Sequence, residues 1–83
     1  MIPIQDLLNR ILWDREFGKG EFCIGYYDRI LDAIVEIPFR QLRFRKGDRF
    51  SFQIEGEFEE LISVPFHRVR VVKKDGCIIW QRT

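Results

Sequence analysis

One stretch decides the fold: residues 69–80, which read VRVVKKDGCIIW. Two runs rich in β-branched residues, 69–73 and 77–80, flank the tripeptide Lys74-Asp75-Gly76. An Asp-Gly pair between two such runs is a strong signal for a tight hairpin. We therefore expect residues 69–80 to form two antiparallel strands.

Before the hairpin, the apolar residues follow two different periods. Residues 3–16 predict a helix with one apolar face, because apolar side chains recur at three- and four-residue intervals: Ile4, Leu7, Leu8, Ile11 and Leu12. Pro3 suits the first helical turn, and Gly18 and Gly20 are suited to end the helix. From residue 21 the period is two, which predicts strands at 21–29, 33–39 and 49–55, and a short apolar run at 61–64 is closed by Pro65.

The side-chain directions follow from these periods. In the strand at 49–55, we expect Phe50 and Phe52 to point inward and Gln53 outward. Trp13 should anchor the last turn of the helix. The connections are too short for parallel crossovers. We therefore expect a single α+β domain over residues 1–83, with the N-terminal helix packed on a curled, mainly antiparallel sheet or small barrel of five to six strands.

Composition limits the classes of function. With 83 residues and a net charge of +1, the chain is one domain and does not resemble a binder that relies on charge alone. No apolar run approaches ~18 residues and no signal-peptide pattern is present, so we expect a cytoplasmic protein with no membrane partner. Cys23 and Cys77 form no CxxC pair and there is one histidine, so we expect no metal and no cofactor.

The one histidine, His67, lies in residues 64–70, VPFHRVR. Arginine presents a planar fork that suits phosphate oxygens, and histidine adds a donor near neutral pH. On a regular strand, His67 would face the core while Arg68 and Arg70 face solvent. If Pro65 instead delays the strand, His67 lies on a loop at the rim of the sheet. The sequence leaves both arrangements open.

Other patterns are less informative. There is no GxSxG elbow and no glycine-rich phosphate loop. Acid–base cleavage of RNA commonly uses two histidines, so no catalytic residue is assigned. The basic residues of 40–49 fit either a track for backbone phosphates or a charged strand that protects a sheet edge: Arg40, Arg43, Arg45, Lys46 and Arg49.

Four short motifs occur in order along the chain. These are LNRI and WD within residues 8–14, YDR at 27–29, PFHRVR at 65–70, and Gly76 followed by Ile79-Trp80 and Arg82. Together they resemble the RNA cyclic-group-end recognition domain family, which is small, chiefly archaeal and formerly catalogued as a domain of unknown function. The resemblance spans residues 3–82. Phe66 stands where the family often has tryptophan, and Asp32-Ala33 stand where relatives tend to carry glycine.

The resemblance implies binding of processed RNA ends, such as 2′,3′-cyclic phosphates, in RNA repair or processing. Relatives are fused to phosphodiesterase or nucleotidyltransferase domains, which implies recognition beside a catalytic RNA-processing partner. The polar motif positions of the family correspond here to Arg10, Asp14, Tyr27, Arg29, His67, Arg68 and Arg82. As ligand-binding residues we expect His67, Arg68, Arg29, Arg82, Tyr27 and Trp80.

These patterns support three hypotheses. The first is a domain that binds RNA ends without catalysis, in which His67 and arginines hold the terminal phosphate and Tyr27 or Trp80 stacks on the terminal base. The second is a phosphodiesterase-like enzyme on RNA ends that uses His67 as acid or base. The third is a protein-interaction adaptor that uses the acidic residues 57–60 or an exposed sheet edge.

Overall fold

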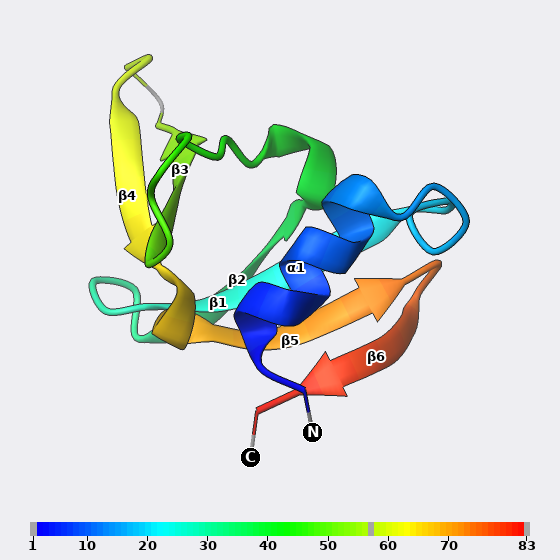
Figure 1. The fold of residues 1–83 in the computed structure, drawn as a ribbon. Helices are drawn as coiled ribbons and strands as arrows, with labels where there is room; N and C mark the ends of the chain where they lie inside the picture. The colour runs from blue at the N-terminus through cyan, green and yellow to red at the C-terminus, as the bar shows by residue number, and fades with distance from the viewer. Residues whose placement is uncertain (1, 57, 83) are drawn as a thin grey trace.

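The computed structural model describes residues 2–56 and 58–82, and this part of the chain contains one α-helix, six strands and two short 3₁₀ helices (Figure 1). In chain order the elements are α1 Ile4–Trp13, β1 Phe22–Asp28, β2 Ala33–Pro38, η1 Phe39–Gln41, β3 Ser51–Glu55, β4 Leu61–Pro65, η2 Phe66–Arg68, β5 Val69–Lys74 and β6 Cys77–Gln81. The α+β class, the N-terminal helix and the antiparallel pairing are confirmed.

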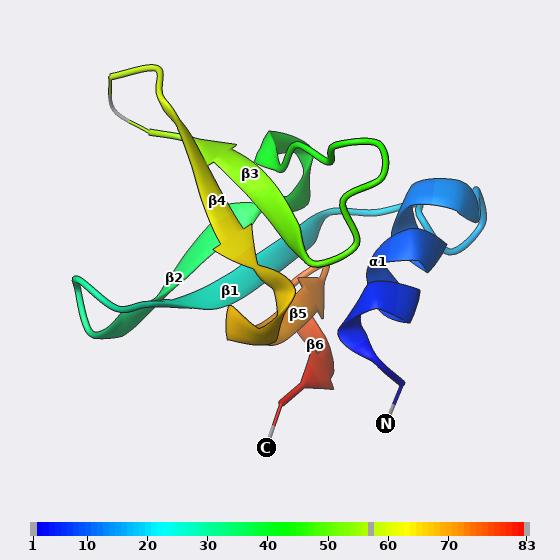
Figure 2. The ribbon, with the colours of Figure 1, turned by 60° about the vertical axis from the view of Figure 1, so that its left-hand side comes forward.

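The strands form two sheets rather than one. The larger sheet has four strands in the order β2-β1-β5-β6, and β3 pairs only with β4 in a separate two-stranded hairpin. Figure 2 shows this hairpin extending away from β1 and β2. The expectation of a single curled sheet or a small barrel is therefore wrong, since the described strands do not close.

Two prolines explain the division into two sheets. Pro38 ends β2 and Pro65 ends β4, and each is followed at once by a 3₁₀ turn. Proline has no N–H for a strand ladder, so pairing stops at these positions. Besides its pairing with β4, the region of β3 is joined to its surroundings by backbone bonds at two places: Arg43 and Gln53 exchange two bonds of 2.8 Å, and the Phe66 N–H donates to the Phe50 carbonyl at 2.8 Å.

The hairpin expected at residues 69–80 is confirmed as β5 and β6. Asp75 and Gly76 form its turn with φ angles of 51° and 84°. Two successive positive φ angles match the right-handed twist of paired strands, and glycine adopts this conformation at little cost. The hairpin places the central strand β5 between β1 and β6.

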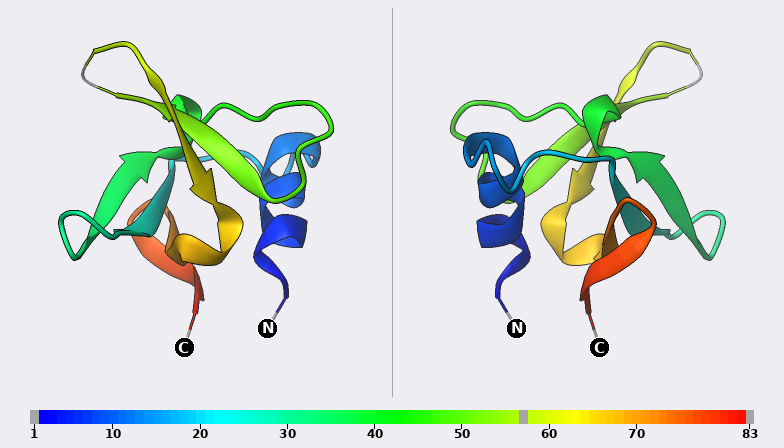
Figure 3. Two further views of the ribbon diagram at one scale, coloured as in Figure 1. Left: turned by 90° about the vertical axis from the view of Figure 1, so that its left-hand side faces the viewer. Right: turned by 90° about the vertical axis from the view of Figure 1, so that its right-hand side faces the viewer.

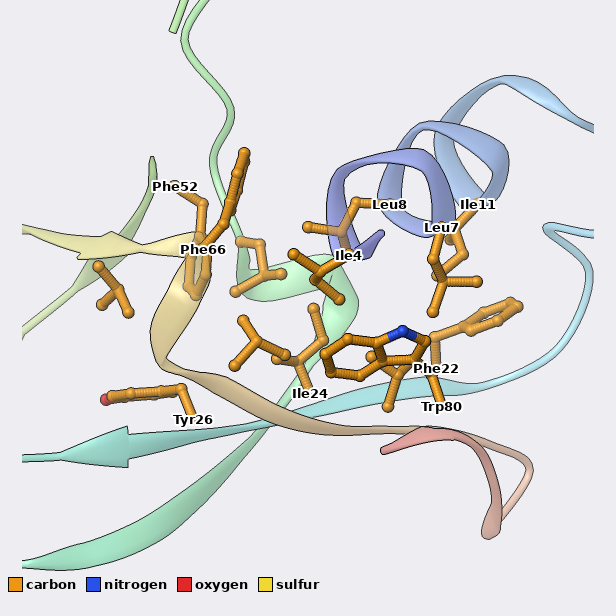
Figure 4. Close-up of a cluster of buried hydrophobic side chains, with 14 residues drawn as sticks. Ile4, Leu7, Leu8, Ile11, Phe22, Ile24, Tyr26, Phe52, Phe66 and Trp80 are labelled. Atoms are coloured by element: carbon orange, nitrogen blue, oxygen red, sulfur yellow. The ribbon is translucent and has the colours of Figure 1, made fainter. Parts of the chain in front are cut away.

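Helix α1 covers one face of the four-stranded sheet (Figure 4). Its buried residues are Ile4, Leu7, Leu8 and Ile11, whereas Leu12 from the expected apolar face is largely exposed. Each large apolar side chain buried in this way contributes about 1.5–3 kcal/mol. The helix ends at Trp13 rather than near residue 16, because Asp14 is extended and its Oδ1 accepts the Glu16 and Phe17 N–H groups at 3.1 Å.

Three expected side-chain directions are wrong. Trp13 is 81% exposed and Phe50 is 77% exposed, whereas the Gln53 side chain is buried. Strand β3 begins only at Ser51, so Phe50 precedes the alternation of the strand. Gln53 is paired on both edges of β3, with Ser63 of β4 on one and with Arg43 on the other, so it lies inside the local pairing and not at a free edge.

Both ends of the described chain lie on the same side of the molecule (Figure 3). The Trp80 indole Nε1–H donates to the Ile2 carbonyl at 2.9 Å, which ties the segment before α1 to β6. Within residues 2–56 and 58–82, no helix is long and apolar enough to cross a membrane.

Candidate functional site

His67 lies on the 3₁₀ turn η2, and not on a strand. Pro65 ends β4, η2 follows, and β5 begins only at Val69. His67 is exposed, while Phe66 before it and Val69 after it are buried. Of the two arrangements that the sequence allows, the structure has the one in which proline delays the strand and the imidazole reaches the surface.

The exposed imidazole lines a groove of about 560 Å³, which we call the histidine groove. The segment before α1, the start of α1, the turn η2 and the end of β6 form its walls. Its lining residues are Ile2, Pro3, Ile4, Gln5, Phe50, Pro65, Phe66, His67, Trp80 and Arg82. Three of the six residues expected from the sequence therefore share one concave surface: His67, Trp80 and Arg82.

Arg82 is held in place at this groove by three contacts. Its backbone N–H donates to the Arg70 carbonyl at 2.8 Å, and its side-chain Nε–H donates to the Val69 carbonyl at 3.0 Å. Its guanidinium carbon lies 5.2 Å from the centre of the Trp80 ring, within cation–π range. The guanidinium has further N–H groups on its two Nη atoms, which makes Arg82 a pre-positioned donor for an anion.

Trp80 supports the groove from below. The side chain is only 6% exposed, and its ring lies beneath α1 among the core residues (Figure 4). Its contacts with Ile2 and Arg82 fix two walls of the groove. The ring with an open face in this groove is Phe50, which the alternating pattern had assigned to the core.

The other expected residues lie elsewhere. Arg68 is half-buried on η2, Tyr27 is near the end of β1 and Arg29 is exposed in the turn after it; none of the three lines the histidine groove. The Tyr27 hydroxyl donates to Asp32, and this hydrogen bond raises the pKa of Tyr27. The Arg70 guanidinium lies 5.8 Å from the Tyr27 ring centre.

A second groove of about 800 Å³ lies between α1 and the loop that joins η1 to β3. We call it the basic groove, because three of its lining residues are Arg45, Lys46 and Arg49; the others are Gln5, Leu8, Asn9, Leu12, Trp13, Phe44, Gly47, Asp48 and Phe66. The two grooves meet at Gln5 and Phe66, which line both.

Asp48 fixes the loop of the basic groove. Its Oδ1 accepts the N–H groups of Phe50 and Ser51 at 2.9 and 3.1 Å, and its Oδ2 accepts the Ser51 hydroxyl at 2.7 Å. The hydroxyl bond and the two backbone bonds lower the pKa of Asp48. The Gln5 side-chain amide donates to the Arg49 carbonyl, so the loop is also tied to α1.

The histidine groove offers hydrogen-bond donors more than acid–base partners. Among residues 2–56 and 58–82, its lining contains one imidazole, one guanidinium and one amide, and no carboxylate, lysine or cysteine. Such a set suits recognition of an anion, whereas acid–base cleavage needs a second titrating group in reach. Among the described residues, no three His, Cys, Asp or Glu side chains gather as metal ligands would.

Comparison with known proteins agrees with the resemblance seen in the motifs. The family model described as the MJ1316 RNA cyclic group end recognition domain matches residues 1–82. A UPF0248 protein from Metallosphaera sedula is 34% identical over 82 residues, which cover 99% of this chain and 95% of that protein. No solved structure matches. On the strength of a match over almost its whole length, this chain belongs to the family of the MJ1316 RNA cyclic group end recognition domain.

Proposed function

We propose that this domain binds processed RNA ends, and that the histidine groove holds the terminal phosphate. The family description motivates the choice of ligand. The observation that carries the proposal is the meeting of an exposed His67 and a pre-positioned Arg82 in one groove. Both groups donate to phosphate oxygens, and hydrogen bonds to charged groups contribute about 1.5–3 kcal/mol each.

The exposed ring of Phe50 stacks on the terminal base in this proposal. Its face is open to solvent and lies in the same groove as His67 and Arg82. Stacking on an aromatic side chain contributes about 1–3 kcal/mol per base and tolerates any base. Arg68, next to His67 on η2, adds positive potential near the phosphate. Tyr27, Arg29 and Trp80 are not direct ligands in this proposal, because the first two lie outside the groove and the third is buried.

Recognition without catalysis fits the donor set better than cleavage does. A cyclic phosphate is a compact monoanion. An imidazole and a guanidinium can hold it by hydrogen bonds, whereas acid–base cleavage needs a second titrating group beside His67, and the described lining of the groove contains no carboxylate, lysine or cysteine. In this proposal the domain brings a separate catalytic RNA-processing protein to the RNA end. The adaptor hypothesis stays a prediction: Glu57 lies outside the described residues, and residues 58–60 lie between β3 and β4.

The test uses short RNAs of one sequence that end in 2′,3′-cyclic phosphate, 3′-phosphate or 3′-OH, with binding followed by fluorescence anisotropy at fixed salt. We expect a phosphorylated end to bind about tenfold or more tightly than the 3′-OH end, as one charged hydrogen bond predicts. Arg82→Gln should remove most of this preference. Arg29→Gln, an exposed arginine outside the groove, serves as the matched control and should retain it.

Equal affinity for all three ends would overturn the proposal. A preference lost in Arg29→Gln but retained in Arg82→Gln would move the site from the histidine groove to the end of β1. The RNA is recovered after each titration and its ends are analysed. Conversion of the cyclic phosphate that requires His67 would establish the phosphodiesterase-like alternative.

A further inference from the structure

An exposed tryptophan marks the basic groove as a separate feature of the molecule. Trp13, the last residue of α1, is 81% exposed, whereas Trp80 is buried. The backbone after Trp13 is pinned by the Asp14 turn, so the indole is presented from a fixed position. Across the groove lies the loop that carries Arg45, Lys46 and Arg49.

The basic residues of 40–49 divide into two groups. Arg40 forms an ion pair with Glu21 at 3.6 Å, and Arg43 forms one with Glu55 at 3.6 Å. By contrast, the three basic residues of the groove form no ion pair with any carboxylate in residues 2–56 and 58–82. Within the described part of the chain, the basic residues of 40–49 that lack an ion-pair partner are therefore those that line the groove together with Trp13.

Asp48, the acidic residue of the same loop, forms no ion pair with Arg45, Lys46 or Arg49 in the described part of the chain. The Asp48 carboxylate is directed into the turn, where the Ser51 hydroxyl and two backbone N–H groups bind it. At the helix end, Arg10 lies 3.8 Å from Asp14 and stacks at 4.1 Å on the Phe17 ring, on another side of α1 from the groove lining. The groove therefore combines open positive charge with one open aromatic face.

The two grooves are continuous. Gln5 and Phe66 line both, and Arg49 of the basic groove is followed in the chain by Phe50 of the histidine groove. A polynucleotide whose terminal phosphate lies at His67 therefore meets the basic groove next. Alternating positive charge and aromatic faces is the arrangement by which proteins bind single strands irrespective of base sequence.

We propose that the basic groove binds the single-stranded RNA segment that precedes the recognised end. Trp13 stacks on a base, and Arg45, Lys46 and Arg49 contact backbone phosphates. This inference rests on the proposed function of the histidine groove and extends it from an end to a strand. Base-paired RNA does not fit this role, because its bases are already stacked on one another and present no free face to Trp13.

The experiment compares two RNAs that both end in 2′,3′-cyclic phosphate: a dinucleotide, which reaches only the histidine groove, and a strand of ~8 nucleotides, within the range of small single-strand sites. Trp13→Ala should weaken the longer RNA about fivefold or more, as the loss of one stacked base predicts, and leave the dinucleotide unchanged. Trp13→Phe, which keeps an aromatic face, should restore most of the affinity. Phe58→Ala, an exposed aromatic outside both grooves, is the matched control.

The charges are tested by the salt dependence of binding. The double variant Arg45→Gln with Lys46→Gln should reduce the slope of log affinity against log salt for the longer RNA by about 0.7 for each phosphate that is no longer neutralised. The double variant Arg40→Gln with Arg43→Gln removes the same charge from paired residues and should leave the slope near that of the wild type.

The outcomes separate this inference from the proposed function. If Trp13→Ala and the charge variants bind the longer RNA like the wild type, while the preference for a phosphorylated end persists, the basic groove is not the strand site and only the end site stands. If Trp13→Ala weakens the longer RNA while all RNA ends bind equally, the strand site stands and the end site falls. Equal weakening of both RNAs, or binding of a duplex as tight as that of the strand, would also overturn the inference.

Discussion

Two turns of this molecule have similar sequences and similar backbone geometry but different surroundings. Residues 37–44 read IPFRQLRF and residues 64–71 read VPFHRVRV. In each, a strand ends at proline and a 3₁₀ turn comes next, with φ and ψ of −62° and 140° at Pro38 and −63° and 142° at Pro65. The Leu42 N–H closes η1 on Phe39, and the Val69 N–H closes η2 on Phe66 in the same way.

The segments after the two turns differ. The chain after η2 enters β5, where Val69 is fully buried, and Phe66 stacks on Phe52 with ring centres 5.9 Å apart. The chain after η1 makes the isolated bridge from Arg43 to Gln53, with Leu42 buried in the core, and then forms the loop of the basic groove. Local sequence thus determines the turn, and the tertiary partners decide whether the chain after it continues as a strand of the sheet or as a loop.

The second residue of each turn shows how function depends on these surroundings. Arg40 in η1 is paired with Glu21, so its charge is matched within the molecule. His67 in η2 occupies the equivalent position, forms no ion pair within the described chain, and shares a groove with Arg82. At this position, η1 therefore presents a cation that is paired within the molecule, whereas η2 presents a hydrogen-bond donor in a groove.

The largest difference between the turns should appear in stability. Phe66→Ala should lower the free energy of unfolding by about 3–5 kcal/mol, because a buried ring leaves a cavity beside Phe52. Phe39 is only partly buried, and Phe39→Ala should cost less, about 1–2 kcal/mol. Urea denaturation followed by circular dichroism measures both values. If Phe66→Ala does not fold, Phe66→Leu replaces it, and equal losses for Phe39→Leu and Phe66→Leu would contradict the distinction.

The next difference concerns binding. His67→Ala should weaken binding of the RNA that ends in 2′,3′-cyclic phosphate about tenfold, because one hydrogen bond to the charged phosphate is lost, and should hardly affect the 3′-OH RNA. Arg40→Ala, at the equivalent position of η1, should stay within about twofold for both RNAs, since an exposed ion pair contributes little. Fluorescence anisotropy measures the affinities. A larger effect of Arg40→Ala than of His67→Ala would place the binding turn at η1.

Much of the fold was accessible from sequence because its signals are local. The Asp-Gly pair predicted the β5–β6 hairpin, and the helical spacing predicted the buried face of α1. The division into two sheets was missed, although Pro38 and Pro65 mark it, because a proline indicates where pairing stops and not which strands pair elsewhere. The exposure of Phe50 was missed because alternation was extended one residue before β3 begins.

The candidate site is harder to predict from the sequence than the fold, for a different reason. His67 drew attention as the one histidine of the sequence, but its exposure depends on whether the strand starts at residue 66 or 69, which a pattern of period two does not decide. The sequence predicts that Trp13 anchors the last turn of the helix, as expected for a side chain that is highly buried on average, whereas its exposure depends on where the loop of the basic groove lies. The two grooves exist only once distant segments are assembled, and no spacing in the sequence encodes them.

Replacing either proline should lower the free energy of unfolding by the same amount, because the two turns have the same backbone geometry at this residue. Pro65→Ala and Pro38→Ala should each cost about 0.4–1 kcal/mol, because proline restricts the unfolded chain and both residues have φ near −63° in the folded protein. Urea denaturation of the two variants tests this equality. A loss at Pro65 several times larger than at Pro38 would mean that the backbone of η2 depends on proline in a way that η1 does not.

The smallest expected effect lies in the loop after η1. Asp48 has a pKa below its ordinary value because the Ser51 hydroxyl and two backbone N–H groups stabilise the carboxylate. A lowered pKa stabilises the folded state above the ordinary value of about 3.9, and this contribution disappears as pH falls through the lowered pKa. Asp48→Asn should therefore lower the Tm slightly at pH 7, by less than either proline variant. The difference from the wild type should shrink below about pH 4; a difference that stays constant with pH would show that the shape of the turn, and not the charge of Asp48, holds this loop against α1.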